Sequence, residues 1–267
     1  MADNIQIIDA RYGKMMVHKL DRYIGKSFIE YGEFSEGKVE VFRQMITKDS
    51  IVIDVGANIG AHTIVFAGLA KEVYAFEPQK HIFHILCGNV ALNELHNVHC
   101  FNVACGDGKQ VHYQDIDMAH HNNMGAASLV DMTQGKEIST IPLDIPCHFL
   151  KIDVEGMELQ VLQGAAEMIR FCQPVIYLEN DRPDKSAQLI EFINSLGYKC
   201  YWHGTALFNP ENLRGNQDNV FPGVGSINML CVPREVTIQG LNEADPKVDW
   251  RELWMTHPET ELSESEA

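Results

Sequence analysis

A glycine-rich loop that follows an apolar strand is the first segment of this sequence with the residue types of a cofactor site. Residues 51–60 read Ile-Val-Ile-Asp-Val-Gly-Ala-Asn-Ile-Gly, and a helix is expected to begin near Ile59. Glycines at such a turn let a ligand approach bare backbone. A dinucleotide fingerprint needs glycines where this loop has Asn58 and Ala61, and the loop does not continue into the Gly-Lys-Ser/Thr of a phosphate-cradling loop. The spacing therefore favours S-adenosylmethionine, which has no pyrophosphate.

A carboxylate on the next predicted strand supplies the partner that this loop needs. Glu77 ends that strand, and a carboxylate roughly 20 residues after the glycines can accept hydrogen bonds from both ribose hydroxyls of an adenosine. Residues 102–107 follow the third strand, at the position whose residues usually contact the adenine ring in this arrangement. The motif alone fits a turn without a ligand equally well. The predicted cofactor-binding residues are Asp54, Gly56, Ala57, Asn58, Gly60, Thr63, Glu77, Pro78, Asn102, Val103 and Asp107.

Two carboxylates at the end of the fourth predicted strand are the candidates for catalysis. Residues 149–156 read Phe-Leu-Lys-Ile-Asp-Val-Glu-Gly, so that Asp153 and Glu155 follow an apolar strand. Ligands of open α/β sheets bind at the carboxyl ends of the strands. These two side chains could therefore orient an acceptor, take its proton or hold the ammonium group of the cofactor. Lys151 alternates with Asp153, which indicates a substrate contact or a salt bridge, and Glu179 after the fifth strand is a second candidate substrate contact or a cap.

Two adjacent histidines, His120 and His121, lie in a polar loop beside the presumed acceptor site, and we predict that they contact the substrate. The 12 histidines of the chain also raise the question of a metal. No four of them have the spacing of a zinc site, so no metal ligand is predicted. A divalent cation such as Mg²⁺ on the carboxylates is compatible with the residue types, but the spacing does not demand one.

Alternating strand and helix patterns place these residues at one edge of a sheet. From about residue 51, β-branched or aromatic runs alternate with stretches of helical spacing, which predicts an α/β fold with a doubly wound parallel sheet. The fully apolar strands indicate a sheet covered on both faces. The predicted strands are Ile51–Val55, Val73–Phe76, Val98–Phe101, Phe149–Ile152, Val175–Leu178, Tyr198–Tyr201 and Ile227–Val232, and the predicted helices are Ile59–Ala70, Gln79–Leu95, Glu158–Ile169 and Lys185–Leu196.

The segments around this pattern divide the chain into three parts. Residues 1–50 are predicted to form an N-terminal extension, a hairpin around residues 12–13 followed by a helical stretch. Residues 51–233 form the sheet domain, with a β-rich insertion at about 106–146. Residues 234–267 form an acidic C-terminal tail.

As a set, these motifs resemble the FkbM-type methyltransferases. The resemblance rests on residues 53–60, 76–78, 150–158 and 174–179, above all on the string Lys-Ile-Asp-Val-Glu-Gly, and it covers roughly residues 51–179. It implies a class I methyltransferase (Rossmann-like) fold, a seven-stranded sheet whose last strand is antiparallel. It also implies S-adenosylmethionine as methyl donor and S-adenosylhomocysteine as product. Many relatives of this kind act on hydroxyls of sugars or natural products, and some methylate nitrogen in peptides.

The sequence therefore predicts an S-adenosylmethionine-dependent methyltransferase, most simply one that methylates a hydroxyl of a sugar or natural-product-like acceptor. Two alternatives stay open, an N-methyltransferase acting on peptide side chains and a non-catalytic binding protein with the same fold. The expected partner is a small-molecule, glycan or peptide acceptor. The segments outside the motifs, which match nothing in the family pattern, are expected to select it.

Composition narrows the class of partner and the location. With 21 Lys+Arg and 37 Asp+Glu the net charge is −16, which disfavours nucleic acid. No apolar run reaches the roughly 20 residues that span a bilayer, and the N-terminus lacks the pattern of a secretion signal. The 7 scattered cysteines contain no Cys-x-x-Cys pair, which is typical of reduced thiols. We expect a cytoplasmic protein without a membrane span, whose oligomeric state the sequence leaves open.

Overall fold

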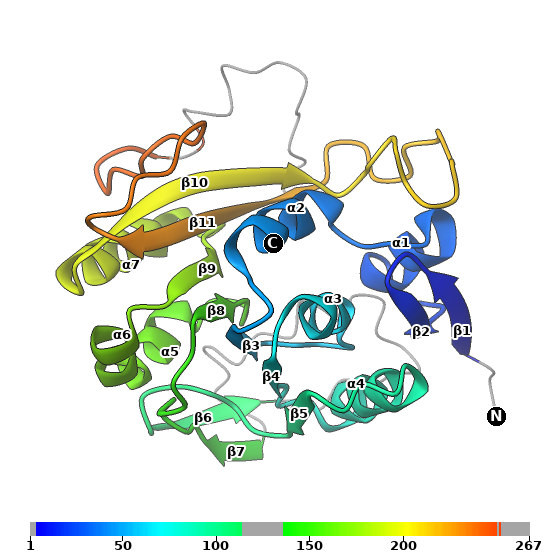
Figure 1. The fold of residues 1–267 in the computed structure, drawn as a ribbon, viewed down its shortest axis with the longest axis horizontal. Helices are drawn as coiled ribbons and strands as arrows, with labels where there is room; N and C mark the ends of the chain where they lie inside the picture. The colour runs from blue at the N-terminus through cyan, green and yellow to red at the C-terminus, as the bar shows by residue number, and fades with distance from the viewer. Residues whose placement is uncertain (1–3, 114–135, 250, 252–267) are drawn as a thin grey trace.

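A seven-stranded sheet forms the centre of the protein, whose computed structural model describes residues 4–113, 136–249 and 251 (Figure 1). The strands are β3 (Ile51–Val55), β4 (Glu72–Phe76), β5 (Val98–Phe101), β8 (Phe149–Ile152), β9 (Val175–Glu179), β10 (Tyr198–Ala206) and β11 (Gly225–Pro233). Their order in the sheet is β10-β11-β9-β8-β3-β4-β5. Five strands pair in parallel, and β11 runs antiparallel to both β9 and β10. This confirms the predicted fold class, including its antiparallel last strand.

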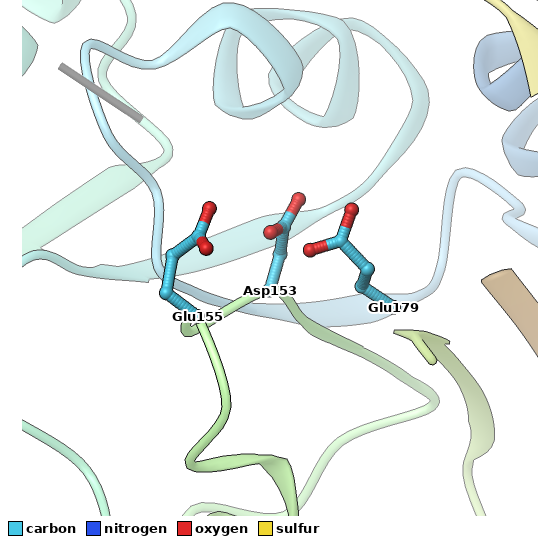
Figure 2. A group of neighbouring side chains, drawn as sticks. All are labelled: Asp153, Glu155 and Glu179. Carbon is cyan, nitrogen blue, oxygen red and sulfur yellow. The ribbon is translucent and has the colours of Figure 1, made fainter. Parts of the chain in front are cut away.

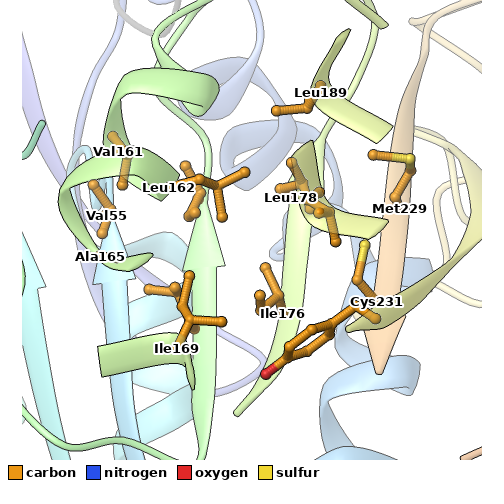
Figure 3. Close-up of a cluster of buried hydrophobic side chains, with 14 of the residues drawn as sticks. Val55, Val161, Leu162, Ala165, Ile169, Ile176, Leu178, Leu189, Met229 and Cys231 are labelled. Atoms are coloured by element: carbon orange, nitrogen blue, oxygen red, sulfur yellow. The ribbon is translucent and has the colours of Figure 1, made fainter. Parts of the chain in front are cut away.

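Helices cover both faces of the sheet, as fully apolar strands predict. They are α1 (Ile24–Tyr31), α2 (Glu36–Met45), α3 (Ala61–Leu69), α4 (Lys80–Leu92), α5 (Glu158–Gly164), α6 (Ala166–Cys172) and α7 (Pro183–Ser195). Alternate residues of a strand point to opposite faces. Ile53 therefore packs with residues of α5, α6 and α7, whereas Val52 packs with residues of α2 and α3. Figure 3 shows part of the first cluster, where Val161 and Leu189 lie on either side of strand residue Leu178.

The parallel register brings the polar residues of neighbouring strands together. Asp54 of β3 pairs with Lys151 of β8, and Lys151 pairs with Tyr177 of β9. The three side chains therefore stand in one row on the face that α2 and α3 cover. The carboxyl ends of these strands lie just beyond this row, and ligands bind at such ends in open α/β sheets.

The single helix predicted over residues 158–169 is two helices, α5 and α6, with a break at Ala165. A Cβ atom at Gly164 would lie only 1.9 Å from the carbonyl oxygen of Gly106. The start of the insertion therefore crosses the helix backbone at this glycine. Because the apolar spacing continues across the break, the sequence pattern alone predicted one continuous helix.

The N-terminal residues form a hairpin and two helices, as expected. Strands β1 (Ile5–Ala10) and β2 (Gly13–His18) pair antiparallel. Two asparagines of α4 hydrogen-bond to the backbone of β2: Asn89 to Met16 and Asn93 to Lys14. The hairpin is thereby attached to the outside of α4.

A buried glutamate joins this N-terminal segment to the loop between β10 and β11. Glu33, between α1 and α2, is 3% exposed and binds Arg11. Its carboxylate also accepts hydrogen bonds from the side chain of Asn209 at 2.7 Å and the backbone N–H of Leu213 at 2.9 Å. One side chain therefore connects three segments that are distant in the sequence.

Residues 25–27 read Gly-Lys-Ser, the last three residues of a phosphate-cradling motif. They lie inside α1, and the position of the motif's first glycine is occupied by Leu20. This triplet is therefore part of an ordinary helix.

The insertion and the C-terminal segment both lie against the sheet domain. Strands β6 (Gln110–Tyr113) and β7 (Lys136–Ser139) pair antiparallel, in agreement with the predicted β-rich insertion. Residues 234–249, predicted to begin an acidic tail, run beside β10, where Ala244 donates its N–H to the carbonyl of Cys200 and is buried. Within the described part of the chain, no helix is both long enough and apolar enough to span a membrane.

Candidate functional site

The glycine loop joins β3 to α3 and lies between the ends of β4 and β8. The backbone N–H groups of Gly56 and Ala57 both donate to the carbonyl oxygen of Phe76, at 3.0 Å each. Gly56 and Gly60 have φ values of +76° and +90°, in the left-handed region that favours glycine. A Cβ atom at Gly56 would lie 1.8 Å from the carbonyl oxygen of Asp153. The loop therefore packs backbone to backbone against the predicted catalytic residue.

A buried ion pair holds the loop on β3. Asp54 is fully buried, accepts a hydrogen bond from the Thr63 hydroxyl at 2.7 Å and lies 3.0 Å from Nζ of Lys151. Lys151 also donates to the carbonyl oxygen of Gly56 at 2.9 Å. Burial works to lower the pKa of Lys151, but the carboxylates of Asp54 and Asp153 outweigh it and raise that pKa. Lys151 thus forms the salt bridge that its spacing allowed, and its substrate contact stays a prediction.

Glu77 lies directly beside the glycine loop. One of its carboxylate oxygens accepts a hydrogen bond from the backbone N–H of Asn58 at 3.0 Å, and the other from the N–H of Gln79 at 2.8 Å. The residue is 6% exposed, and this burial outweighs the hydrogen bonds and raises the pKa of Glu77 to about 7. The loop and the carboxylate that were predicted to share one ligand are therefore in contact.

The residues after β5 are only partly brought to this site. Asn102 donates its side-chain N–H groups to the backbone carbonyls of Glu77 at 2.9 Å and Pro78 at 3.0 Å. Asp107 instead binds its neighbour Lys109, whose hydrogen bond lowers the pKa of Asp107. Asn102 thus connects β5 to the predicted cofactor site, while the carboxylate of Asp107 pairs with Lys109, two residues along the chain. Val103, between them, is half-buried.

Asp153, Glu155 and Glu179 form an acidic cluster at the ends of β8 and β9 (Figure 2). Carboxylate oxygens of the three residues all lie within 4.8 Å of one another. Figure 2 shows the three side chains pointing in the same direction from the ends of their strands. The sequence placed each residue at the end of a strand, and the parallel pairing of β8 with β9 brings them together.

The three carboxyl groups of the cluster hold different charges. Burial favours the neutral form of Asp153, but the ammonium groups of Lys151 and Lys38 outweigh burial and lower the pKa of Asp153 to about 2. Burial, followed by the charge of Asp153, raises the pKa of Glu155 to about 8 and the pKa of Glu179 well above its ordinary value. At neutral pH the cluster therefore combines the carboxylate of Asp153 with Glu155, which is mostly protonated, and with Glu179, whose raised pKa favours its protonated form.

The backbone at Glu155 has an unusual conformation. Its φ is +54°, and that of the following Gly156 is +98°. A non-glycine residue in the left-handed region costs roughly 1–2 kcal/mol, and such strain is concentrated at functional sites. The turn is held by Arg182, which donates to the Glu155 carboxylate at 3.2 Å. This conformation makes the sharp turn after β8 and keeps Glu155 within the cluster.

Three carboxylates at this spacing have the donor atoms for a divalent cation. Two ammonium groups, however, already lie at the same oxygen, because Nζ of Lys151 is 3.7 Å and Nζ of Lys38 is 3.9 Å from Oδ2 of Asp153. A divalent cation at Asp153 would be repelled by both. The charges around Asp153 therefore favour a cluster that lysines balance.

Sequence reasoning missed several polar residues on the sheet face above this cluster. Lys38 comes from the N-terminal extension, where no motif marks it. His62 of α3 is buried among aromatic rings that include Phe42, and its Nε2 has no hydrogen-bond partner among the described residues. Tyr177 of β9 hydrogen-bonds to Nδ1 of His203 on β10 at 2.8 Å. The pairing order of the strands and the packing of α2 and α3 on the sheet, which no local pattern reveals, bring these groups near Asp153.

A polar pocket of about 350 Å³ opens beside α2 and the end of β10. It is lined by Glu36, Gly37, Glu40, His203, Gly204, Thr205, Ala206, Phe208, Asn209 and Pro210. Two carboxylates, an imidazole, an amide and an aromatic ring are therefore available to a ligand, and this lining contains no lysine or arginine. The predicted substrate contacts His120 and His121 lie outside the described residues.

The donor set around the glycine loop fits S-adenosylmethionine. The carboxylate of Glu77 stands where the two hydroxyls of a ribose would bind. Asp54, Glu77 and Asp153 surround the loop, and the ammonium group of Lys151 beneath it is neutralised by Asp54 and Asp153. This balance suits a ligand with a positive sulfonium and ammonium group and does not suit a pyrophosphate. Glu77, Asn102 and the loop backbone are the residues that would hold it.

Known proteins resemble the chain in sequence and in fold. The tRNA(Phe) (4-demethylwyosine(37)-C(7)) aminocarboxypropyltransferase of Methanocaldococcus jannaschii is 34% identical over 94 residues, which are 33% of this chain and 38% of that protein. The crystal structure of M. jannaschii TYW2 in complex with AdoMet matches with a TM-score of 0.50 at 17% identity over 88% of both chains. A methyltransferase FkbM from Methylobacillus flagellatus KT matches with a TM-score of 0.45 at 16% identity, over 69% of this chain and 44% of that one.

These likenesses differ in what they establish. The chain spans less than half the length of the aminocarboxypropyltransferase and of the M. flagellatus protein. At 17% identity the match to TYW2 shows the fold alone, a fold that binds AdoMet in that protein.

A longer match covers the site itself. The family model of the methyltransferase FkbM domain matches residues 54–200, more than half of the chain. The matched stretch begins at Asp54 and contains the glycine loop, Glu77 and the whole acidic cluster. The chain therefore belongs to the FkbM methyltransferase domain family and carries a methyltransferase domain whose cofactor is S-adenosylmethionine.

Proposed function

We propose that the protein transfers a methyl group from S-adenosylmethionine to a hydroxyl group of a small-molecule or glycan acceptor. The observation that carries this proposal is the state of Asp153. It is an ionised carboxylate that touches the glycine loop through its own backbone, and it stands between two carboxyl groups whose pKa values are raised. A hydroxyl acceptor needs such a group to take its proton.

The proposed chemistry needs little of the protein beyond alignment and one proton acceptor. S-adenosylmethionine supplies a methyl group that its sulfonium already activates, so the protein mainly aligns the acceptor and excludes water. The proton of a neutral hydroxyl becomes strongly acidic only as the oxygen gains its new bond to carbon. At that stage even a carboxylate with a pKa of about 2, such as Asp153, can accept it. Glu155 is mostly protonated at neutral pH, and the pKa of Glu179 is also raised. In their protonated forms both can donate hydrogen bonds to other oxygens of the acceptor.

Two features support a neutral, hydroxylated acceptor. The pocket beside α2 is lined by carboxylates, an amide and the ring of Phe208. The carboxylates can accept hydrogen bonds from hydroxyl groups, and the amide can accept or donate them. The net charge of −16 opposes the approach of a polyanion. The relative from M. jannaschii acts on tRNA, but binding a phosphate backbone requires Lys and Arg at the contact surface. We therefore favour a sugar or natural-product hydroxyl over RNA.

The proposed function is tested by incubating the protein with S-adenosylmethionine labelled in its methyl group and a panel of acceptors. The panel contains free and glycosidically linked sugars, phenolic and aliphatic alcohols, unstructured peptides and bulk tRNA, each with and without EDTA. Label on a hydroxyl oxygen, undiminished by EDTA, is the expected result. Label in peptide nitrogen or in tRNA would replace the proposed acceptor class, and loss of the signal in EDTA would assign a metal to the acidic cluster.

Replacing Glu77 with alanine is expected to weaken binding of S-adenosylhomocysteine by about 10- to 150-fold, because hydrogen bonds to a charged group are each worth roughly 1.5–3 kcal/mol. Isothermal titration measures this directly and needs no acceptor. Glu72→Ala is the matched control, since Glu72 begins β4, the strand that Glu77 follows, and binds His99 outside the site. Equal affinities of Glu77→Ala and wild type would contradict the placement of the ribose at Glu77.

Affinity for S-adenosylhomocysteine is expected to rise with pH across neutrality. Burial raises the pKa of Glu77 to about 7, so the carboxylate that accepts the ribose hydroxyls is mostly protonated at pH 6 and mostly ionised at pH 8. The ionised fraction of Glu77 therefore rises about tenfold from pH 6 to pH 8, and the affinity for S-adenosylhomocysteine should rise by the same factor. Titrations at pH 6, 7 and 8 check this. The Glu77→Gln variant should show no such dependence, and a wild-type affinity that falls as pH rises would contradict the assignment.

A further inference from the structure

Lys38 is a buried lysine that the N-terminal extension inserts beside the acidic cluster. It lies in the first turn of α2 and is 4% exposed. The neighbouring Val39 and Phe42 pack against the sheet, which fixes the face of α2 that turns toward β8. Nζ of Lys38 lies 3.9 Å from Oδ2 of Asp153.

Asp153 is thus placed between two lysines with different surroundings. Lys151 is held by Asp54 and by the carbonyl of Gly56 in addition to Asp153. Among the described residues, the ammonium group of Lys38 has no hydrogen-bond partner within 3.5 Å, and its ion pair is with Asp153. Lys151 would therefore stay in place without Asp153, whereas Lys38 depends on that carboxylate.

The groups that sense the charge of Lys38 come from four elements of the sheet domain. They are Asp153 after β8, Glu179 at the end of β9 with Asp181 beyond it, His62 of α3 and His203 of β10. Lys151 of β8 shares Asp153 with Lys38. A buried ammonium group is costly unless a counter-charge compensates it. Its position among these groups indicates a purpose other than the stability of α2.

We propose that Lys38 is a positioning residue of the active site, which holds and orients the carboxylate of Asp153 toward the acceptor and so makes the N-terminal extension part of the catalytic machinery. This inference rests on the proposed function for the role of Asp153, but the contact itself can be tested without an acceptor. Lys38 would act through Asp153, keeping it in the ionised state that accepts the proton.

The decisive experiment compares Lys38→Met, Lys38→Arg and wild type, all saturated with S-adenosylhomocysteine. Carboxyl ¹³C resonances are followed from pH 8 to pH 4, with the Asp153→Asn spectrum to identify the signal of Asp153. An opposite charge at this distance lowers the pKa of a carboxyl group by about 1–3 units. We expect the Asp153 signal to stay constant down to pH 4 in wild type and Lys38→Arg, and to move toward the position of the protonated form within this range in Lys38→Met. The affinity of both Lys38 variants for S-adenosylhomocysteine should stay within about twofold of the wild-type affinity.

Activity gives a second readout once an acceptor is known. The acid limb of the kcat profile should move to higher pH in Lys38→Met and return in Lys38→Arg, while KM for the cofactor stays constant. Lys71→Met is the control, because Lys71 is exposed before β4. An Asp153 signal that titrates identically in all variants would overturn the inference even if methyl transfer is found. If Lys38→Met fails to fold, a Lys38→Arg variant whose Asp153 titrates at higher pH than wild type would also overturn it. A shifted Asp153 signal without any methylated hydroxyl would instead overturn the proposed function alone.

Discussion

Replacing Gly56 with alanine is expected to destabilise the protein by on the order of 3–5 kcal/mol, one of the largest effects of a single methyl group. The new Cβ would lie 1.8 Å from the carbonyl oxygen and 2.8 Å from the carbonyl carbon of Asp153, and these backbone atoms cannot move aside as the end of a flexible side chain could. The φ of +76° adds strain for any residue other than glycine. The loop must therefore separate from the end of β8.

Thermal unfolding measures this effect, and a loss of that size lowers Tm by about 10 °C or more in a protein of this length. Gly68→Ala is the matched control. Gly68 lies near the end of α3, and its added Cβ would meet nothing within 4 Å. Alanine is favoured over glycine in a helix by about 1 kcal/mol, so this variant should melt at or slightly above the wild-type temperature. A Gly56→Ala protein that melts with wild type would show that the loop does not rest on Asp153.

Asp153→Asn is expected to lower kcat for methyl transfer by about 10²- to 10⁴-fold, the range for loss of a positioned proton acceptor. The amide keeps the size of the side chain but cannot take the proton of a hydroxyl. The remaining groups of the cluster are poor substitutes, because burial raises the pKa of Glu155 to about 8 and also raises the pKa of Glu179, which favours their protonated forms. Initial rates with the acceptor found in the labelled screen provide the measurement.

The interpretation of that loss depends on the cofactor still binding. S-adenosylhomocysteine should bind Asp153→Asn within a few-fold of wild type, since Glu77 and the loop backbone are unchanged. Asp49→Asn, at an exposed position before β3, serves as the control and should keep full activity. If Asp153→Asn keeps most of the wild-type kcat, Asp153 is not the proton acceptor, and alignment of the acceptor is the only role left for the cluster.

Much of the cofactor side of the site could be predicted from the sequence because its parts are local. Gly56, Asn58 and Glu77 belong to two strand-to-loop turns, and the parallel order of β3 and β4 brings them into contact. The acidic cluster was predictable in part for the same reason. Asp153 and Glu179 each end an apolar strand, so their chain positions already indicated the sheet edge that they share.

The surroundings of Asp153 were less predictable, because only the tertiary fold brings their residues into contact. Lys38 lies in a helix with no motif, and only the packing of α2 on the sheet brings it to Asp153. Asp107 was predicted to contact the cofactor because of its position after β5. Its carboxylate pairs with Lys109, two residues along the chain, and the cofactor contact stays a prediction. The sequence also does not reveal the protonation states of the cluster, since the difference in pKa between Asp153 and Glu155 arises from burial and from neighbouring charges.

The contacts of Glu33 set the order in which the site can be assembled. Its partners Asn209 and Leu213 follow it by 176 and 180 residues, and between them lies almost the entire sheet. Contacts between such distant positions form only after the intervening chain has folded, since the entropy of closing the loop must first be overcome. The helix that carries Lys38 leaves the ribosome well before residues 209–213 do. It gains its complete set of neighbours only after those residues have been synthesised, so a nascent chain that stops before them has the glycine loop but not every contact that holds α2 in place.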